Sequence, residues 1–514
     1  MKKTLIGLAA LGLAYGGAAY TTGLLVQRQM DSEVGKVSRM LPMLKVSEDV
    51  HIRGLFGSTR VTTFNVTALL NTQACAKPED GEEVAEAAEK PQPALGTPPA
   101  EPLLISIKSI ITHGPLPGFG LPAAASVRYE LLVNGQPVAD GSGLKLEGEM
   151  PRLSQRYGFT GNSVSSVQGG AGKLIYTPKA GKGDISVSWP SMALKGSSKA
   201  DLSAITYEGK LPELLVSFTT PKGESGTLAL KGLALKAEHH YPIAGQMFVY
   251  TGSDQFSLAS AEVQMNGKPL FSAENIEANG KATLEAGLLD SSTQISLASV
   301  KAGGEVLGPM HYDFTLAKLD AAAYGQLMDS LFKNDLGHCP TPEQTAALVE
   351  KVTAQLPGLI KSGPEFRIDR ISIGYQGQQA LITGKLGLPA ASAEQLANPL
   401  ALISLADASL TVSLPDQLIQ ALAVKSMGTK MAQQMALAEG AEASAQPSSE
   451  QLAQAQAAAE AMIAQQMEQA LARNWVVRSK EGVTSTLEYH RGTAMLNGQQ
   501  LDLEGLRGGA PAAE

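Results

Sequence analysis

Apolar and polar residues alternate with a period of two along much of the chain from Val61 onward. The alternation is clearest in residues 103–108, 185–189, 228–235 and 368–373, and glycine or proline lies near the ends of these runs. Successive side chains of a β-strand point to opposite faces, so this period is typical of strands with one buried face. The pattern therefore predicts a chain built mainly from strands.

Three short segments share the order hydrophobic, Asn, Gly, Lys or Gln, Pro or Gln, hydrophobic: residues 133–138, 265–270 and 496–501. Both central residues of a type I′ turn need positive φ, which asparagine and glycine tolerate. The repetition predicts recurring antiparallel hairpins, and we favour this interpretation over a ligand-binding loop.

Two segments change from strand to helix periodicity. Residues 314–320 and 410–416 alternate, and apolar residues at helical spacing follow each of them. Asp320 and Asp416 stand at the two junctions, where a carboxylate can cap a helix or meet the positive end of its dipole. We interpret both as helix-start residues, in preference to catalytic carboxylates.

A longer helix is predicted over residues 449–473, which are rich in alanine, glutamine and methionine. We expect its apolar face to pack on the sheet, in preference to binding a partner. The predicted fold class is α+β and β-rich: a single N-terminal transmembrane helix, then an elongated, mostly antiparallel sheet, with helices concentrated in the C-terminal half. Such a sheet must cover its apolar face. Self-covering is favoured, and an open apolar groove is the alternative.

The N-terminus has the form of an export signal. Lys2 and Lys3 precede an uncharged run at residues 4–26. About 20 apolar residues cross the roughly 30 Å hydrocarbon core of a bilayer, whereas a cleaved signal has only about 7 to 15. The length favours a retained signal anchor with most of the chain outside the cytoplasm, and cleavage near Ala19 is the alternative.

The expected organisation starts with a signal anchor at 1–30, whose transmembrane segment is at 4–26. A single periplasmic domain follows, with a β-rich part at 31–312 and an α+β part at 313–507. A disordered tail at 508–514 ends the chain. Residues 76–102 are acidic and proline-rich, and too polar to form a core, so they are predicted to be a disordered insertion. The chain has two cysteines, Cys75 and Cys339, and the expected compartment is oxidising. They can form a disulfide or remain free thiols, and the sequence does not decide between the two.

Composition and the absence of known motifs argue against several classes of function. The net charge of −8 argues against nucleic acid as a partner, because binding phosphates requires clustered Lys and Arg. No GxSxG or HExxH motif is present, and GGAGKL at residues 169–174 departs from a phosphate-binding loop. His239 and His240 are adjacent, so on a strand they point to opposite faces and cannot both ligate one metal.

Two other histidines, His113 and His338, are candidates for catalytic residues. His113 ends a strand before a Gly-Pro break, and a structural role is favoured over acid/base catalysis. His338 lies beside Cys339, and this pair could act as a nucleophile and base only if the backbone brought both side chains together. We therefore assign no catalytic, metal-ligating or cofactor-binding residue and expect no cofactor, and we expect that the protein is not an enzyme.

Several stretches resemble the YdgA-like family of proteobacterial inner-membrane and periplasmic proteins, a domain of unknown function. They are the Lys-Lys start with its apolar run, RGLFGSTR at 53–60, ITHGPL at 111–116, the unit around Leu319-Asp320 and GTAMLNGQQ at 492–500. The resemblance implies a single-pass protein of the bacterial inner membrane that faces the periplasm and self-associates. It carries over no catalytic residue.

The favoured function is non-catalytic binding or scaffolding in the cell envelope. One alternative is a lipid-binding or lipid-handling protein with an apolar groove, and the other is an enzyme acting on envelope polymers. The expected partners are the inner membrane through the N-terminal helix, a second copy of the chain, and a lipid or an envelope protein.

Overall fold

The computed structural model describes residues 2–40, 45–65, 104–133, 136–137, 144–177, 183–220, 223–333, 342–389, 404–420, 424–438 and 448–501. The chain forms two compact units. Unit 1 comprises Met1–Phe256, Ala261–Pro269 and Tyr324–Gln355, and unit 2 comprises Ser257–Ser260, Leu270–Ala323 and Leu356–Glu514. Antiparallel strands dominate both units, which confirms the β-rich fold class. The boundary expected after residue 312 stays a prediction.

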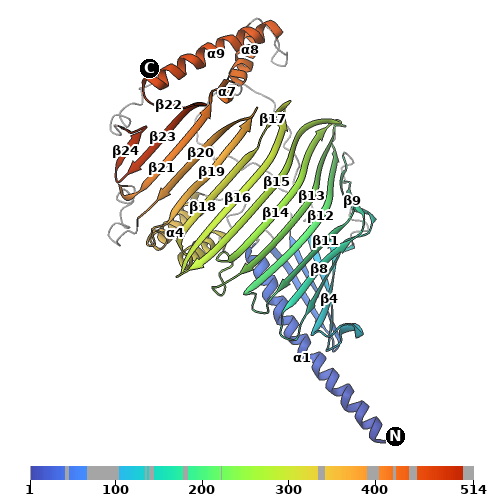
Figure 1. The fold of residues 1–514 in the computed structure, drawn as a ribbon. Helices are drawn as coiled ribbons and strands as arrows, with labels where there is room; N and C mark the ends of the chain where they lie inside the picture. The colour runs from blue at the N-terminus through green and yellow to red at the C-terminus, as the bar shows by residue number, and fades with distance from the viewer. Residues whose placement is uncertain are drawn as a thin grey trace. The chain divides into compact units, whose positions relative to one another are not determined.

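The sheet of unit 1 is antiparallel throughout and follows the order β1, β2, β3, β4, β7, β8, β11, β12, β13 (Figure 1). Its first strand precedes the alternation that starts at Val61, and its second strand spans that start. The strands are β1 (Lys45–Arg53), β2 (Gly57–Asn65), β3 (Leu104–His113), β4 (Ala125–Val133), β7 (Arg152–Tyr157), β8 (Ser163–Gly169), β11 (Met192–Ser198), β12 (Ala204–Thr219) and β13 (Ser225–His240).

Strand β12 exchanges one partner for another along its length. Residues 205–210 pair with β11, and residues 215–218 pair with β10 (Ile185–Trp189). Pro212, which has no N–H to donate, lies between these two stretches. The remaining pieces of unit 1 are β5 (Gln136–Pro137) on β4, then β6 (Leu144–Gly148) and β9 (Gly172–Tyr176) beyond β10, and the short helix η1 (Pro117–Phe119). Strand β14 (Thr251–Met265) contributes residues to both units.

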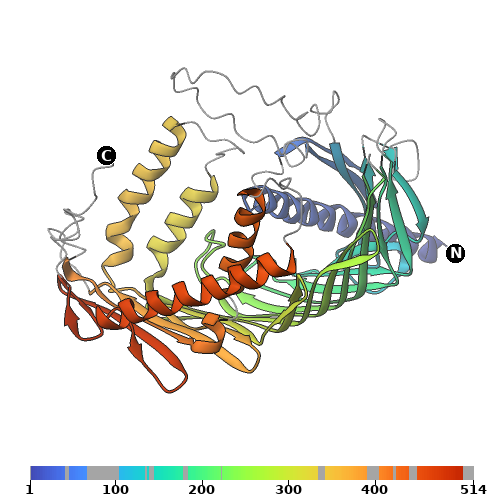
Figure 2. The same ribbon diagram turned by 90° about the horizontal axis from the view of Figure 1, so that it is seen from above.

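Helix α1 (Lys2–Met40) lies along the sheet of unit 1 (Figure 2). Val26 and Met30 are buried in one cluster with Ile111, Val127 and Tyr157 from β3, β4 and β7. Ala19 is also fully buried. Small residues on this helix let its backbone approach the sheet, so part of the apolar N-terminal run forms the core of unit 1.

The transmembrane helix expected at residues 4–26 is not supported by the structure. Ala19 and Val26, which belong to that segment, are in contact with protein. Among the residues described, no helix is both long enough and apolar enough to cross a membrane. The side chains of residues 1–14 lie outside the described part of the structure.

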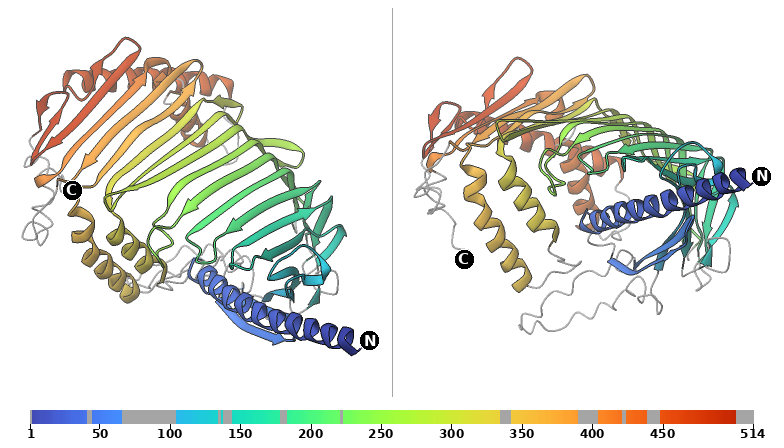
Figure 3. Two further views of the ribbon diagram at one scale, coloured as in Figure 1. Left: turned by 60° about the horizontal axis from the view of Figure 1, so that its bottom comes forward. Right: turned by 90° about the horizontal axis from the view of Figure 1, so that it is seen from below.

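The sheet of unit 2 is also antiparallel, in the order β15, β16, β18, β19, β20, β21, β23, β24, β25 (Figure 3). Two short strands pair at its side, β17 with β16 and β22 with β23. The bounds are β15 (Lys268–Glu285), β16 (Leu288–Ala302), β17 (Glu305–Leu307), β18 (Met310–Asp320), β19 (Glu365–Tyr375), β20 (Gln378–Gly387), β21 (Asp407–Pro415), β22 (Val477–Arg478), β23 (Gly482–His490), β24 (Thr493–Leu496) and β25 (Gln499–Gln500).

The Asn-Gly turns form as predicted where the structure describes them. Asn266 and Gly267 have φ of 50° and 72° between β14 and β15. Asn497 and Gly498 have φ of 50° and 77° between β24 and β25. In the third segment, β4 and β5 pair as a hairpin, and residues 134–135 lie outside the described part.

Both strand-to-helix junctions are confirmed. β18 continues into α3 (Ala321–Lys333), where Asp320 Oδ1 accepts a hydrogen bond of 2.9 Å from the Ala323 N–H, so Asp320 is a cap. β21 continues into α7 (Asp416–Ile419). Asp416 lies in the first turn, where it meets the helix dipole and pairs with Arg478 at 2.8 Å, but it caps no N–H group.

Helix α9 (Ser449–Ala472) starts at a capping box in which the Ser448 hydroxyl accepts from the Gln451 N–H and the Gln451 side chain accepts from the Ser448 N–H. Its buried residues Ala455 and Ala459 pack against α8 (Lys425–Ala438). The small-residue face of α9 matches the small-residue face of α8, and the packing of α9 on the sheet stays a prediction. Helix α4 (Pro342–Ile360) was not predicted.

Several predictions concern residues outside the described part of the structure: the insertion at 76–102, the tail at 508–514, a Cys75 to Cys339 disulfide and the His338 and Cys339 pair. They stay predictions.

Candidate functional site

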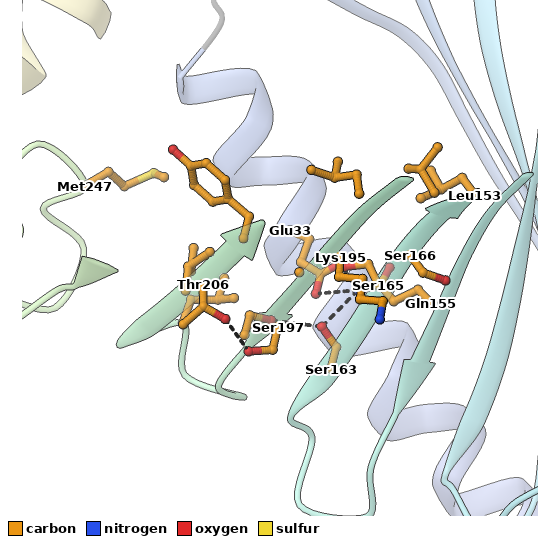
Figure 4. A pocket seen from close by; sticks show the side chains of 17 residues that line it. Glu33, Leu153, Gln155, Ser163, Ser165, Ser166, Lys195, Ser197, Thr206 and Met247 are labelled. Atoms are coloured by element: carbon orange, nitrogen blue, oxygen red, sulfur yellow. Dashed lines mark hydrogen bonds between the residues drawn. The ribbon is translucent and has the colours of Figure 1, made fainter. Parts of the chain in front are cut away.

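A cavity of about 480 Å³ lies on one face of the unit 1 sheet, over β7, β8, β11 and β12 (Figure 4). Residues that pair across neighbouring strands point to the same face, so the pairing defines rows of side chains. Three rows run beneath the cavity: Tyr157, Ser163, Ser198 and Ile205; then Gln155, Ser165, Gly196 and Tyr207; then Leu153, Val167, Leu194 and Gly209.

The hydroxyl groups around this cavity are engaged with one another. Ser163 and Ser198 lie 2.9 Å apart through their Oγ atoms. Ser197 Oγ lies 2.7 Å from Thr206 Oγ1, but these two side chains alternate with the rows above and therefore point to the other face of the sheet. Gln155 Nε2 also donates to Ser163 Oγ at 3.0 Å. Because these polar atoms satisfy each other, the surface left for a ligand is chiefly carbon. A largely apolar hollow of this size falls in the range of small-molecule sites.

Helix α1 contributes one carboxylate to the cavity wall, that of Glu33. Glu33 Oε2 accepts a hydrogen bond of 2.8 Å from the hydroxyl of the fully buried Tyr157. The hydroxyl of Tyr129 donates to Gln155 Oε1. Burial raises the pKa of both tyrosines, so both remain protonated donors. Glu33 is thus held at the cavity edge by the wall itself.

A buried arginine fixes α1 on the sheet next to this wall. The Arg60 side chain, 3% exposed, pairs through Nη1 with Asp31 of α1 at 3.0 Å. Its Nε and Nη2 atoms donate to the two carboxylate oxygens of Asp49 at 2.8 and 2.5 Å. The hydrogen bond from Arg60 holds the pKa of Asp49 below its usual range. Since Asp31 and Glu33 share one helical turn, the clamp at Arg60 also sets the position of Glu33.

His113 is buried where α1 crosses β3. Its Nε2 lies 3.2 Å from Ser58 Oγ, and Gly23 of α1 covers the ring so closely that an added Cβ would lie 3.0 Å from Cε1. Burial lowers the pKa of His113, so the imidazole is neutral at pH 7. A ring sealed in this way has no route to a substrate, which supports the structural role expected from the sequence.

Acidification should therefore lower the free energy of unfolding of unit 1. Burial lowers the pKa of both His113 and His51 below the unfolded value of about 6.5, so the unfolded chain protonates first as pH falls. The urea midpoint of unit 1 should drop between about pH 7.5 and about pH 5.5. H113Q should reduce this drop, and H240Q, at an exposed position, should not. An equal pH dependence in all three proteins would contradict the assignment.

The pair His239 and His240 diverges, as expected. His239 Nε2 lies 2.6 Å from Asp254 Oδ1, and His240 Nε2 lies 3.2 Å from Glu238. Rings of Tyr207, Tyr241 and Tyr250 surround His239 at centroid distances of 5.9, 6.2 and 4.3 Å. Burial raises the pKa of Tyr250 to about 12. In the described part of the chain, no group of three potential metal ligands occurs. Residues 169–174 join two strands, which is unlike a phosphate-binding loop before a helix.

Unit 2 carries a second apolar hollow, of about 300 Å³, over β19, β20, β21 and β23. Its rows are Phe366, Leu386, Ala408 and Tyr489, then Ile368, Gly384, Leu410 and Leu487. The Phe366 ring stacks on Phe314 at 6.0 Å. Phe366, Leu386, Leu410 and Leu487 stay exposed. Among the residues described, these four side chains leave part of the apolar face of this sheet exposed, and self-covering of the sheet stays a prediction.

Alternation in the sequence could not reveal the unit 1 cavity, because its rows contain serine and glycine at inward positions.

The comparisons with known proteins agree with the resemblance to the YdgA-like family. The profile of the family described as "Bacterial protein of unknown function (DUF945)" matches residues 1–504. The chain is 23% identical to Protein YdgA of Escherichia coli (strain K12) over 546 aligned residues, which cover 98% of this chain and 96% of that protein. No solved structure matches the chain significantly.

Proposed function

Because the chain belongs to the DUF945 family of bacterial proteins of unknown function, we propose a function from its own geometry: non-catalytic binding of the apolar chain of an amphiphile in the unit 1 cavity. The observation that carries this proposal is the cavity of about 480 Å³, whose lining is chiefly carbon and whose Ser163 and Ser198 hydroxyls pair with each other. An apolar molecule entering it displaces water without leaving a polar group unsatisfied.

The polar end of the ligand would meet Glu33, the one carboxylate among the described residues of the lining. A carboxylate accepts hydrogen bonds from hydroxyl or ammonium groups and repels an anionic head. Lys195 also belongs to the lining, but it lies between the inward-facing Leu194 and Gly196, so its side chain points to the other face of the sheet. The proposed ligand is therefore an amphiphile with a neutral or cationic head. The apolar hollow of unit 2 favours the same ligand chemistry, as a second and smaller contact for an apolar chain.

We also propose a location that suits this ligand: the bacterial inner membrane, with a single N-terminal pass and the bulk of the chain in the periplasm. The basis is the Lys2-Lys3 start and the uncharged residues that follow it, ahead of the part of α1 that packs on the sheet. Self-association and contact with an envelope protein complete the proposed partners.

A cavity-filling variant tests the proposed function. Gly196 lies at the centre of the middle row, and a Cβ there would lie 3.4 Å from Ser165 Oγ, so a side chain can enter the hollow. G196L should weaken binding of the neutral apolar fluorophore N-phenyl-1-naphthylamine about tenfold, since the leucine occupies the volume the probe needs. Fluorescence titration gives the affinity, and a long-chain alkylamine should displace the probe.

The matched control is Q168L, on the outward face of the neighbouring strand β8, where the lining is not touched. It adds the same side chain to the same sheet and should leave the affinity unchanged. Equal affinities of wild type and G196L, with both proteins folded, would show that the probe binds elsewhere.

A further inference from the structure

Three loops without a charged residue lie together at one end of unit 1. They are residues 54–56 between β1 and β2, 114–122 between β3 and β4, and 158–162 between β7 and β8. The His113 N–H donates to the Phe56 carbonyl at 2.9 Å, and the Ala124 N–H donates to the Tyr157 carbonyl at 2.8 Å. These bonds place the loops side by side. In a chain of which 18% is charged, their composition is unusual.

Large apolar side chains of these loops are exposed. Leu121 is 64% exposed, Phe159 53% and Leu55 50%. Phe56 and Leu116 are exposed as well, so each loop presents at least one large apolar group. Scattered exposed leucines need no explanation, but a contiguous uncharged group from three loops indicates an interaction surface.

The N-terminal part of α1 leaves unit 1 at the same end. The Tyr15 ring lies 5.9 Å from the Phe56 ring, and its hydroxyl donates to the Leu116 carbonyl at 3.1 Å. The N-terminal end of α1 projects past the ends of the strands of unit 1 (Figure 1). The sequence there is uncharged back to Lys3. Arg53, beside the loops, lies over the Tyr20 ring at 4.2 Å, a pairing of basic and aromatic groups suited to a lipid headgroup region.

Helix length supports a lipid bilayer as the occupant. Residues 2–14 extend about 20 Å at 1.5 Å per residue, which is short of the roughly 30 Å hydrocarbon core. Apolar elements that lie in a membrane interface enter by about 5–10 Å. If the three loops enter the membrane to that depth, their depth adds to the length of residues 2–14. The helix then reaches across the hydrocarbon core while its later residues stay packed on the sheet. The neighbouring turn at 199–203 carries Lys199 and Asp201, which marks where the uncharged surface ends.

We propose that the loops at 54–56, 114–122 and 158–162 form a bilayer-contacting surface that seats unit 1 in the outer leaflet of the membrane that α1 enters. This surface goes beyond the proposed ligand binding and does not depend on what the cavity holds. It also places the cavity near lipid, because Ser163, which lines the cavity, directly follows the last of these loops.

The test uses the full chain, with Cys75 and Cys339 replaced by serine and one new cysteine carrying the fluorophore NBD. The new cysteine is at Leu121 (L121C), or at Ile185 of β10, an aliphatic residue that is also exposed but lies outside the loops (I185C). In vesicles of phosphatidylethanolamine and phosphatidylglycerol, the label at 121 should emit about threefold more strongly than in detergent-free buffer and resist quenching by iodide. The label at 185 should remain fully quenched.

A second variant guards against an effect of the label itself. L121E combined with F159E should reduce flotation with the same vesicles about tenfold relative to I185E, because two apolar contacts are replaced by charges. Equal iodide quenching at 121 and 185, or equal flotation of the two glutamate proteins, would overturn the surface and assign the loops to another partner.

Discussion

Replacing Arg60 with methionine should lower the free energy of unfolding of unit 1 by about 3 kcal/mol. Arg60 Nη1 lies 3.0 Å from Asp31 and Arg60 Nε lies 2.8 Å from Asp49. R60M removes the cation that these two carboxylates share. The effect is placed at the lower end of the range for breaking a buried pair, since both carboxylates keep some contact with water. Urea unfolding monitored by circular dichroism measures it.

The matched control is R128M, which removes an arginine from β4 of the same unit. Arg128 is largely exposed and lies 3.5 Å from Glu130, so its loss should cost less than about 1 kcal/mol. R60M should also increase hydrogen exchange in residues 15–33, because the clamp holds α1 on the sheet. A stability loss in R60M no larger than in R128M would show that α1 docks through its apolar face alone.

Truncating Tyr157 to alanine should cost unit 1 about 3–5 kcal/mol, the range for removing a fully buried aromatic ring. Y157F isolates the hydroxyl, whose hydrogen bond to the Glu33 carboxylate is worth about 1.5–3 kcal/mol. Y157F should also weaken binding of an amine-headed amphiphile, since Glu33 loses the donor that positions it at the cavity wall. Unfolding and ligand titrations on the same preparations give both numbers.

Y176A is the control for this pair, because Tyr176 ends β9 with an exposed ring. It should cost less than about 1 kcal/mol. If Y157F binds the amphiphile as wild type does while Y157A unfolds, Tyr157 supports the fold but has no part in ligand orientation.

Strands and tight turns were the most predictable part of this fold, because their rules are local. Asn266-Gly267 and Asn497-Gly498 carry their turn geometry in two adjacent residues. The sequence did not reveal Ala286-Gly287 and Gln376-Gly377, which make similar connections with φ of 51° and 82°, and of 49° and 81°. In each, a long pair of hydrogen-bonded strands holds a non-glycine residue at positive φ, an effect of tertiary structure on a weak local preference.

The candidate site depended on contacts that no local rule contains. An uncharged, small-residue run suits a bilayer and a protein surface equally well, so the sequence could not indicate that Ala19 and Val26 pack on β3 and β4. The partner of His113 is Ser58, on another strand. The cavity rows join Ser165 to Gly196 across two strands, and only the register of β8 and β11 brings them together.

Photolabelling measures most directly whether the unit 1 cavity holds an apolar chain. A long-chain alkylamine with a diazirine at its methyl end, incubated with the full chain and irradiated, should label peptides that contain residues 163–167 and 194–207. G196L should remove this label. Labelling concentrated on residues 366–386 and 408–410 of unit 2, or spread evenly over the surface and unaffected by G196L, would contradict the account.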